Sequence, residues 1–148
     1  MRPFLQLFPF LLLLVGCAGP KETAGVDDAG ASIGTSQVVV TYEGSPTEAY
    51  RAAAQALQDA GFTLAESDAT LRTLTTAPKS GSDTFGPVDD MVVSAQVRSE
   101  DGVTVVLSGT YGDDTAIEKR GQSGSPARKA WARLHQLAER IGEPTAYR

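Results

Sequence analysis

The chain has 148 residues, and 13 lysines and arginines are outnumbered by 18 aspartates and glutamates, which gives a net charge of −5. An acidic chain without a basic patch is repelled by nucleic-acid backbones and by anionic lipid, so binding to either through surface charge is excluded. The single cysteine excludes an intrachain disulfide.

Residues 1–16 have the layout of a secretory signal peptide. Arg2 supplies a positive charge, and the stretch 4–15 is apolar except for Gln6. A membrane-spanning helix needs about 20 apolar residues, whereas this stretch is shorter and is interrupted by Pro9. We therefore expect residues 1–16 to be removed on export.

The sequence Leu14-Val15-Gly16-Cys17 resembles the lipobox of bacterial lipoproteins. In that family a peptidase cuts before the cysteine, which then carries lipid. The resemblance implies that Cys17 is the lipid attachment site and that several acyl chains anchor the protein stably to the membrane. Ala18 in place of an aspartate implies, by the family's sorting rule, the outer membrane facing the periplasm in a diderm bacterium. An ordinary signal peptide with a chance cysteine and an uncleaved anchor helix are the alternatives.

Composition divides the rest of the chain into three parts. Residues 17–36 contain the lipidated cysteine followed by a flexible linker rich in glycine, alanine, serine and aspartate. Residues 37–142 are expected to form one folded domain, a size that supports a single core. Residues 143–148 are expected to be a C-terminal tail, because Gly142 and Pro144 stop the preceding helix.

Within the domain, turn and capping residues separate runs of helical and strand periodicity. Ser45-Pro46 and Ser125-Pro126 each combine a capping serine with a proline at the first helical position, and Glu48 completes a capping box in the first case. Gly61 ends the first helix. The predicted elements are a strand at Val38–Tyr42, a helix from Pro46 to Gly61, strands at Phe62–Glu66, Leu71–Thr76, Met91–Arg98 and Val103–Tyr111, and a helix from Pro126 to Gly142.

Each predicted helix has an apolar stripe that can cover a sheet. The stripe of the first helix consists of Tyr50, Ala53, Ala54 and Leu57, and that of the second consists of Ala127, Ala130, Trp131, Leu134, Leu137, Ala138 and Ile141. Alternation in the strands at Met91–Arg98 and Val103–Tyr111 predicts one covered face and one face largely toward water. Trp131 is therefore interpreted as a core anchor at the contact between helix and sheet, with a ligand platform as the alternative.

The order β-α-β-β-β-β-α predicts an α+β fold, a two-layer sandwich in which both helices cover one face of an antiparallel-rich sheet. This order behind a lipobox is similar to several small envelope lipoproteins. It also looks like the helix-on-sheet domains of the C lipoprotein of the outer-membrane β-barrel assembly machinery. That likeness covers Cys17 and the element order only.

Few residues point to chemistry, so no catalytic residue, metal site or cofactor is predicted. His135 is the only histidine and lies at the edge of the apolar stripe, which is typical of a boundary residue of a helix. The acidic pairs Asp89-Asp90 and Asp113-Asp114 could bind a cation or serve a glycosidase, but turn formation is a sufficient explanation. The glycine-rich segment 121–125 lacks the lysine of a phosphate-binding loop.

Strand directions suggest where a partner would be recognised. If the hairpins alternate in direction, the long polar loops at 78–87 and 112–124 lie at one end of the sheet, together with the start of the first strand. Loops of this length are often functional. The predicted recognition residues, which border these loops, are Lys79, Asp83, Asp113, Asp114, Lys119 and Arg120.

These features favour a membrane-anchored envelope lipoprotein that binds another envelope protein without catalysis. A small-ligand or lipid carrier, with a pocket between helices and sheet, is the first alternative, and an enzyme acting on peptidoglycan or lipid is the second. Membrane contact is expected through the acylated cysteine, and no nucleic-acid partner is expected.

Overall fold

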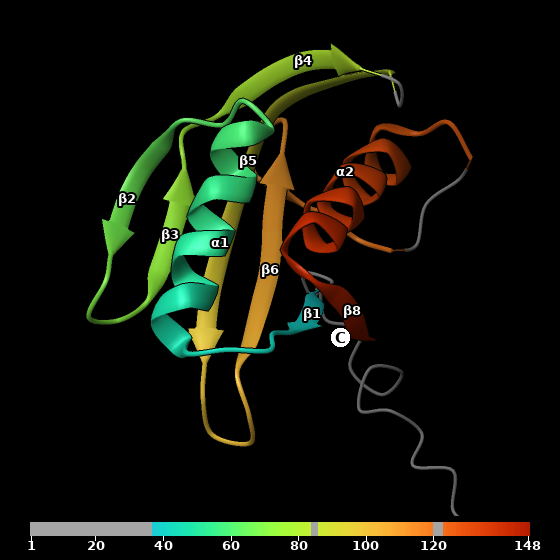
Figure 1. Ribbon diagram of the computed structural model, residues 1–148. Coiled ribbons are helices and arrows are strands. Elements are labelled where there is room, and N and C mark those ends of the chain that lie inside the picture. Colours follow the sequence, from blue (N-terminus) through green and yellow to red (C-terminus); the bar gives the residue numbers. More distant parts are fainter. Residues whose placement is uncertain (1–36, 84–85, 120–122) are drawn as a thin grey trace, which may run out of the picture. The chain divides into compact units, whose positions relative to one another are not determined.

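The computed structural model describes residues 37–83, 86–119 and 123–148, and Figure 1 shows them as a sheet covered by two helices. The elements of this part are β1 (Val38–Thr41), α1 (Pro46–Asp59), β2 (Leu64–Asp68), β3 (Thr73–Thr76), β4 (Lys79–Asp83), β5 (Gly86–Arg98), β6 (Thr104–Tyr111), β7 (Thr115–Ala116), α2 (Pro126–Ile141) and β8 (Glu143–Tyr147). Neither helix is long and apolar enough to span a membrane.

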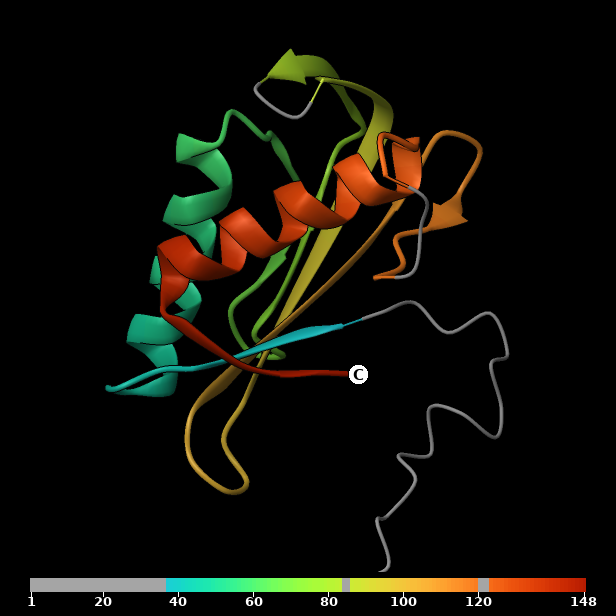
Figure 2. The same ribbon diagram turned by 90° about the vertical axis from the view of Figure 1, so that its right-hand side faces the viewer.

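The sheet is antiparallel throughout and has the strand order β2-β3-β5-β6-β1-β8. Two short strands lie off this path, because β4 pairs with β5 and β7 pairs with β6. Both helices cover the same face, as the two views show (Figures 1 and 2). The predicted α+β two-layer sandwich is confirmed.

The serine-proline pairs begin the helices as predicted. The Ser45 hydroxyl accepts a hydrogen bond from the Glu48 amide at 3.2 Å, and the Ser45 amide donates to the Glu48 carboxylate at 2.8 Å. This capping box satisfies backbone donors that the first turn leaves without partners. Ser125 caps α2 with its hydroxyl alone, which accepts a hydrogen bond from the Arg128 amide at 3.3 Å.

The core lies between the helix layer and the inner face of the sheet. On β5 and β6 the residues that alternate inward are buried, among them Val93, Val105 and Leu107. The predicted stripe of α2 is buried over Ala130, Trp131, Leu134, Leu137, Ala138 and Ile141. On α1 the buried residues are Ala49, Ala53, Ala56 and Leu57, whereas Tyr50 and Ala54 are half-buried at the border.

A glycine allows the segment after β6 to close over the core. Ile117 is fully buried, and its amide donates to the Gly109 carbonyl oxygen at 2.9 Å. A Cβ atom at Gly109 would lie 2.4 Å from the Val92 carbonyl oxygen and 3.0 Å from Ile117 Cδ1. The stretch 112–124 was predicted to be a polar loop. Part of it instead forms the short strand β7 and buries the side chain of Ile117.

The loop predicted at 78–87 is wrong over most of its length, because β4 pairs with an extended β5 there. Its small polar residues have low strand propensity, and pairing with a long neighbouring strand overrides it. Asp90 has a φ of 47°, and its amide and carboxylate both bond to the Ser80 hydroxyl. Asp90 therefore has a structural role in the irregular pairing of β4 with β5.

The tail predicted at 143–148 is also wrong, because residues 143–147 form the edge strand β8 beside β1. Pro144 argued against a strand, but proline is tolerated at a sheet edge, where its missing N–H has no partner to lose. A Cβ atom at Gly142 would lie 3.0 Å from Val40 Cγ1, so the glycine lets the chain turn tightly from α2 onto β1.

Candidate binding groove

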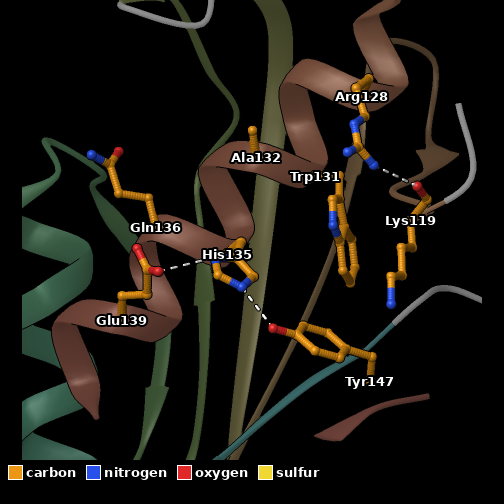
Figure 3. Close-up of a pocket in the computed structure, with 8 residues that line it drawn as sticks. All are labelled: Lys119, Arg128, Trp131, Ala132, His135, Gln136, Glu139 and Tyr147. Carbon is orange, nitrogen blue, oxygen red and sulfur yellow. Dashed lines mark hydrogen bonds and ion pairs between the residues drawn. The ribbon is translucent and has the colours of Figure 1, made fainter. Parts of the chain in front are cut away.

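A groove of about 460 Å³ lies between α2, β8 and the segment that precedes α2 (Figure 3). We call it the α2–β8 groove. Its lining residues are Lys119, Arg128, Trp131, Ala132, His135, Gln136, Glu139 and Tyr147. Figure 2 faces the edge of the sandwich where α2 lies above β1 and β8.

Helical spacing brings three of these side chains into one row. Trp131, His135 and Glu139 follow one another at intervals of four residues, so they lie on the same side of α2. Trp131 is 5% exposed and belongs to the core, whereas the His135 side chain is 33% exposed and that of Glu139 is 56% exposed. The row therefore runs from the buried interior to solvent.

The edge strand supplies the opposite wall. Tyr147 of β8 is 38% exposed, and its hydroxyl lies 2.6 Å from His135 Nε2. The two ring planes are within 11° of parallel, and Figure 3 shows the rings joined edge to edge by this bond. The Trp131 ring is 5.8 Å away from that of Tyr147 and tilted by 55°. The three rings form a continuous aromatic wall.

Charge is divided between the two ends of the groove. At one end Lys119 Nζ lies 4.5 Å from the centre of the Tyr147 ring, and Arg128 donates to the Lys119 carbonyl oxygen at 3.2 Å. At the other end Glu139 Oε1 lies 3.4 Å from His135 Nδ1. The groove thus carries two cations and one carboxylate, in a chain whose total charge is negative.

The arrangement suits recognition better than catalysis. Glu139, His135 and Tyr147 form a row of carboxylate, imidazole and phenol, joined by a 3.4 Å contact and a 2.6 Å hydrogen bond. In enzymes an orienting group, a base and a nucleophile occur in this order. All three side chains are, however, substantially open to water, and catalytic groups gain their strength from water-excluded surroundings. The same row fixes the rings in place, which favours binding by a preformed surface.

Of the predicted recognition residues whose side chains the structure describes, only Lys119 lines the groove. Lys79 has a structural role, because its ammonium donates to the Ala60 carbonyl oxygen at the end of α1 and lies 4.9 Å from the Phe62 ring centre. Asp113 and Asp114 are exposed in the turn between β6 and β7. The side chain of Asp83 and the whole of Arg120 lie outside the described residues.

The structure does bring the two predicted loop regions together. The Gly112 amide donates to the Asp89 carbonyl oxygen at 2.8 Å, so the start of the 112–124 segment meets β5 beside the β4–β5 hairpin. On the helix side, Arg133 donates to the Gly81 carbonyl oxygen at 3.1 Å. Both regions therefore lie at one end of the sheet, and their part in recognition stays a prediction.

Sequence reasoning missed Tyr147 and Glu139. The spacing of four between His135 and Glu139 was a readable signal for a helical pair. Tyr147 had no such signal, because it reaches the groove only through the pairing of β8 with β1. Cys17 lies outside the described residues. Within those residues, no group of three or more histidine, cysteine, aspartate or glutamate side chains could hold a metal ion.

No protein-family model matches this chain, and no curated protein matches it. What the groove binds is therefore inferred from its own side chains.

Proposed function

We propose that the chain is a lipid-anchored protein of the bacterial cell envelope whose folded domain binds another protein without catalysis. The lipobox-like residues 14–17 support the anchor. The linker at 18–36 would span roughly 24 Å as a flexible chain, at about 5–6 Å × √n, which lets the domain meet partners away from the membrane.

The observation that carries the binding role is the convergence of Lys119, Trp131, His135 and Tyr147 in one groove. These side chains come from three separate segments and are held by bonds between the segments. Exposed aromatic and cationic side chains beside a buried tryptophan are typical of protein-recognition sites, where tyrosine, tryptophan and arginine dominate the binding energy.

A small-ligand carrier is the alternative that the groove volume favours, because ligand pockets commonly measure about 300–1,000 Å³. The charged residues of the wall, Lys119, Arg128 and Glu139, make a lipid chain a poor fit. Between helices and sheet, where a carrier would hold its ligand, the space is filled by small and branched side chains such as Ala53 and Val93.

Site-specific photocrosslinking in the producing cells tests this proposal. A photoreactive residue at Gln136, which lines the groove, is compared with one at Gln58, an exposed position of α1. We expect a discrete crosslinked protein from Gln136 and none from Gln58, and we expect Tyr147→Ser to abolish it. Equal capture from both positions, or capture unaffected by Tyr147→Ser, would contradict the proposed groove.

The wider recognition surface is tested in the same cells. Asp113→Asn and Asp114→Asn, introduced together, remove two exposed charges from the β6–β7 turn. A reduced crosslink yield from Gln136 would support their part in partner recognition. An unchanged yield would show that Asp113 and Asp114 do not belong to the recognition surface, which would then consist of the groove only.

A further inference from the structure

We propose that the partner of the α2–β8 groove is an extended, acidic peptide segment that pairs with the backbone of Tyr147 and directs a carboxylate toward Lys119. This inference rests on the proposed function and specifies the partner's chemistry. Three independent features of the described residues support it: the open edge of β8, the side of the sheet on which Tyr147 lies, and the charge at the adjacent end of the groove.

The backbone of Tyr147 faces outward from the sheet. Gln37 and Arg148 exchange backbone hydrogen bonds in both directions, one of them 3.0 Å long. In an antiparallel pair, the N–H and C=O of successive residues point alternately toward the partner strand and away from it. The N–H and C=O of Tyr147 therefore point away from β1, at an edge where β8 ends the strand order of the described sheet.

Two features restrict this edge to a single pairing position. Pro144 has no N–H to offer, and the register between β1 and β8 shifts around Thr145. Proline and bulges are common protections against unwanted strand pairing. They leave Tyr147 as the place where an added strand can exchange hydrogen bonds, so the register of an incoming peptide is fixed.

That register determines which peptide side chain enters the groove. Two residues directly opposite each other in an antiparallel pair place their side chains on the same face, with Cβ atoms about 4.5–5.5 Å apart. The ring of Tyr147 lies on the helix side, in the groove. The peptide residue opposite Tyr147 therefore directs its side chain into the groove beside that ring (Figure 3).

The charge at this place favours an acidic side chain. Lys119 Nζ lies 4.5 Å from the centre of the Tyr147 ring, and Arg128 lines the same end. A glutamate opposite Tyr147 brings its carboxylate to these cations, and its methylene groups contact the aromatic wall. A lysine at the same position would meet like charge, which selects against it.

The test uses the mature acylated chain in detergent micelles and a capped pentapeptide with a central glutamate between two valines and two outer threonines. Trp131 is the only tryptophan, so its fluorescence reports on the groove during a titration. We expect saturable binding of the glutamate peptide. We expect affinity to fall about tenfold or more with glutamine at the centre, and further with lysine.

N-methylation separates strand pairing from simple charge attraction. A methyl group on the central glutamate nitrogen removes the N–H that would donate to the Tyr147 carbonyl oxygen, and should weaken binding about tenfold. A methyl group on the next valine nitrogen, which points away from β8, should change the affinity less than about twofold. Equal effects of the two methyl groups would overturn the strand-pairing mode.

Protein variants complete the test. Lys119→Gln should weaken the glutamate peptide about tenfold and leave the glutamine peptide unchanged, whereas Arg98→Gln removes the same charge from the other face of the sheet and should have no effect. An identical fluorescence change with acetate alone would indicate a site for small anions and overturn the peptide proposal. If no peptide binds while Gln136 still crosslinks a partner in cells, the proposed function stands and this inference fails.

Discussion

His135 and Tyr147 are joined by a 2.6 Å hydrogen bond between Nε2 and the phenol oxygen, which ties the middle of α2 to the edge strand β8. On the opposite side of the imidazole, Glu139 lies near Nδ1. Both residues line the α2–β8 groove, so one interaction both ties β8 to α2 and shapes the candidate binding surface.

Replacement of Tyr147 by phenylalanine removes this bond and keeps the ring. Because the site is partly open to water, we expect a loss of about 0.5–1 kcal/mol in the free energy of unfolding, measured by urea titration. A double-mutant cycle with His135→Gln should give a coupling energy of about 0.5 kcal/mol or more. Tyr42→Phe, combined with the same histidine variant, is the control and should be additive. Additivity at Tyr147 as well would show that the bond contributes no stability.

Trp131 is the largest side chain at the contact between α2 and the sheet, and it is 5% exposed. Truncation to alanine should cost roughly 3–5 kcal/mol, because both the transfer of apolar surface and the cavity left behind oppose folding. Leu71→Ala is the matched control, since Leu71 is 67% exposed and its loss should stay within about 0.5 kcal/mol. A loss below about 1 kcal/mol for Trp131 in a denaturant titration would show that its burial contributes little.

The helices and long strands could be predicted because their signals are local. Each serine-proline pair places a cap and the first turn, and the spacing of apolar residues such as Leu57 and Leu134 gives the buried face. The alternation along β5 and β6 likewise gives the inner residues without knowledge of the neighbouring strands. These elements are sufficient to define the two-layer α+β fold.

The strands β4, β7 and β8 could not be predicted, because nonlocal pairing creates them. The β4 segment is glycine- and serine-rich and pairs only because β5 extends beside it. The β8 segment begins after a glycine and contains Pro144, which locally argues for a chain end. Tyr147 reaches the groove only through the pairing of β8 with β1. The groove therefore could not be predicted from the sequence, although His135 and Lys119 could both be named as candidate residues.

Cys17 is predicted to be acylated and to be the first residue of the mature protein. Mass spectrometry of the mature N-terminus should find a lipid-modified cysteine, and Cys17→Ser should release the protein from the membrane or leave an uncleaved precursor. Because the chain has no other cysteine, reaction with a maleimide reports on this thiol alone. A free thiol in the membrane fraction, or cleavage at another position, would disprove the lipobox interpretation.

Gly109 is predicted to be intolerant of even one added carbon. Alanine would place its Cβ 2.4 Å from the Val92 carbonyl oxygen, which belongs to the neighbouring strand and cannot rotate away. We expect a loss of roughly 1–3 kcal/mol in the free energy of unfolding, as for other overpacked sites. Gly81→Ala is the control, because no heavy atom of the described residues, apart from those of its chain neighbours, lies within 4 Å of its added Cβ. Similar stabilities of the two variants would show that β5 and β6 can move apart at no cost.

The capping box predicts a pH dependence of stability. The pKa of Glu48 is lowered from its usual 4.5, chiefly because the Ser45 amide donates to its carboxylate, then because of the Ser45 hydroxyl and, to a smaller extent, the charge of Arg51. A carboxyl group whose pKa is lower in the folded state stabilises that state at a pH above its unfolded pKa. The stabilisation is lost as the pH falls through the folded pKa, below 4.5.

The measurement compares the free energy of unfolding of the natural chain and Glu48→Gln by urea titration from about pH 7 to about pH 3. The difference should be constant near neutral pH and should shrink as the pH falls below about 4.5. In a Ser45→Ala background the difference should be smaller throughout but should persist, because the backbone donor at residue 45 remains. A difference that grows on acidification would mean that protonated Glu48 stabilises the folded state more than ionised Glu48 does. That result would contradict the direction in which the Ser45 donors shift the pKa of Glu48.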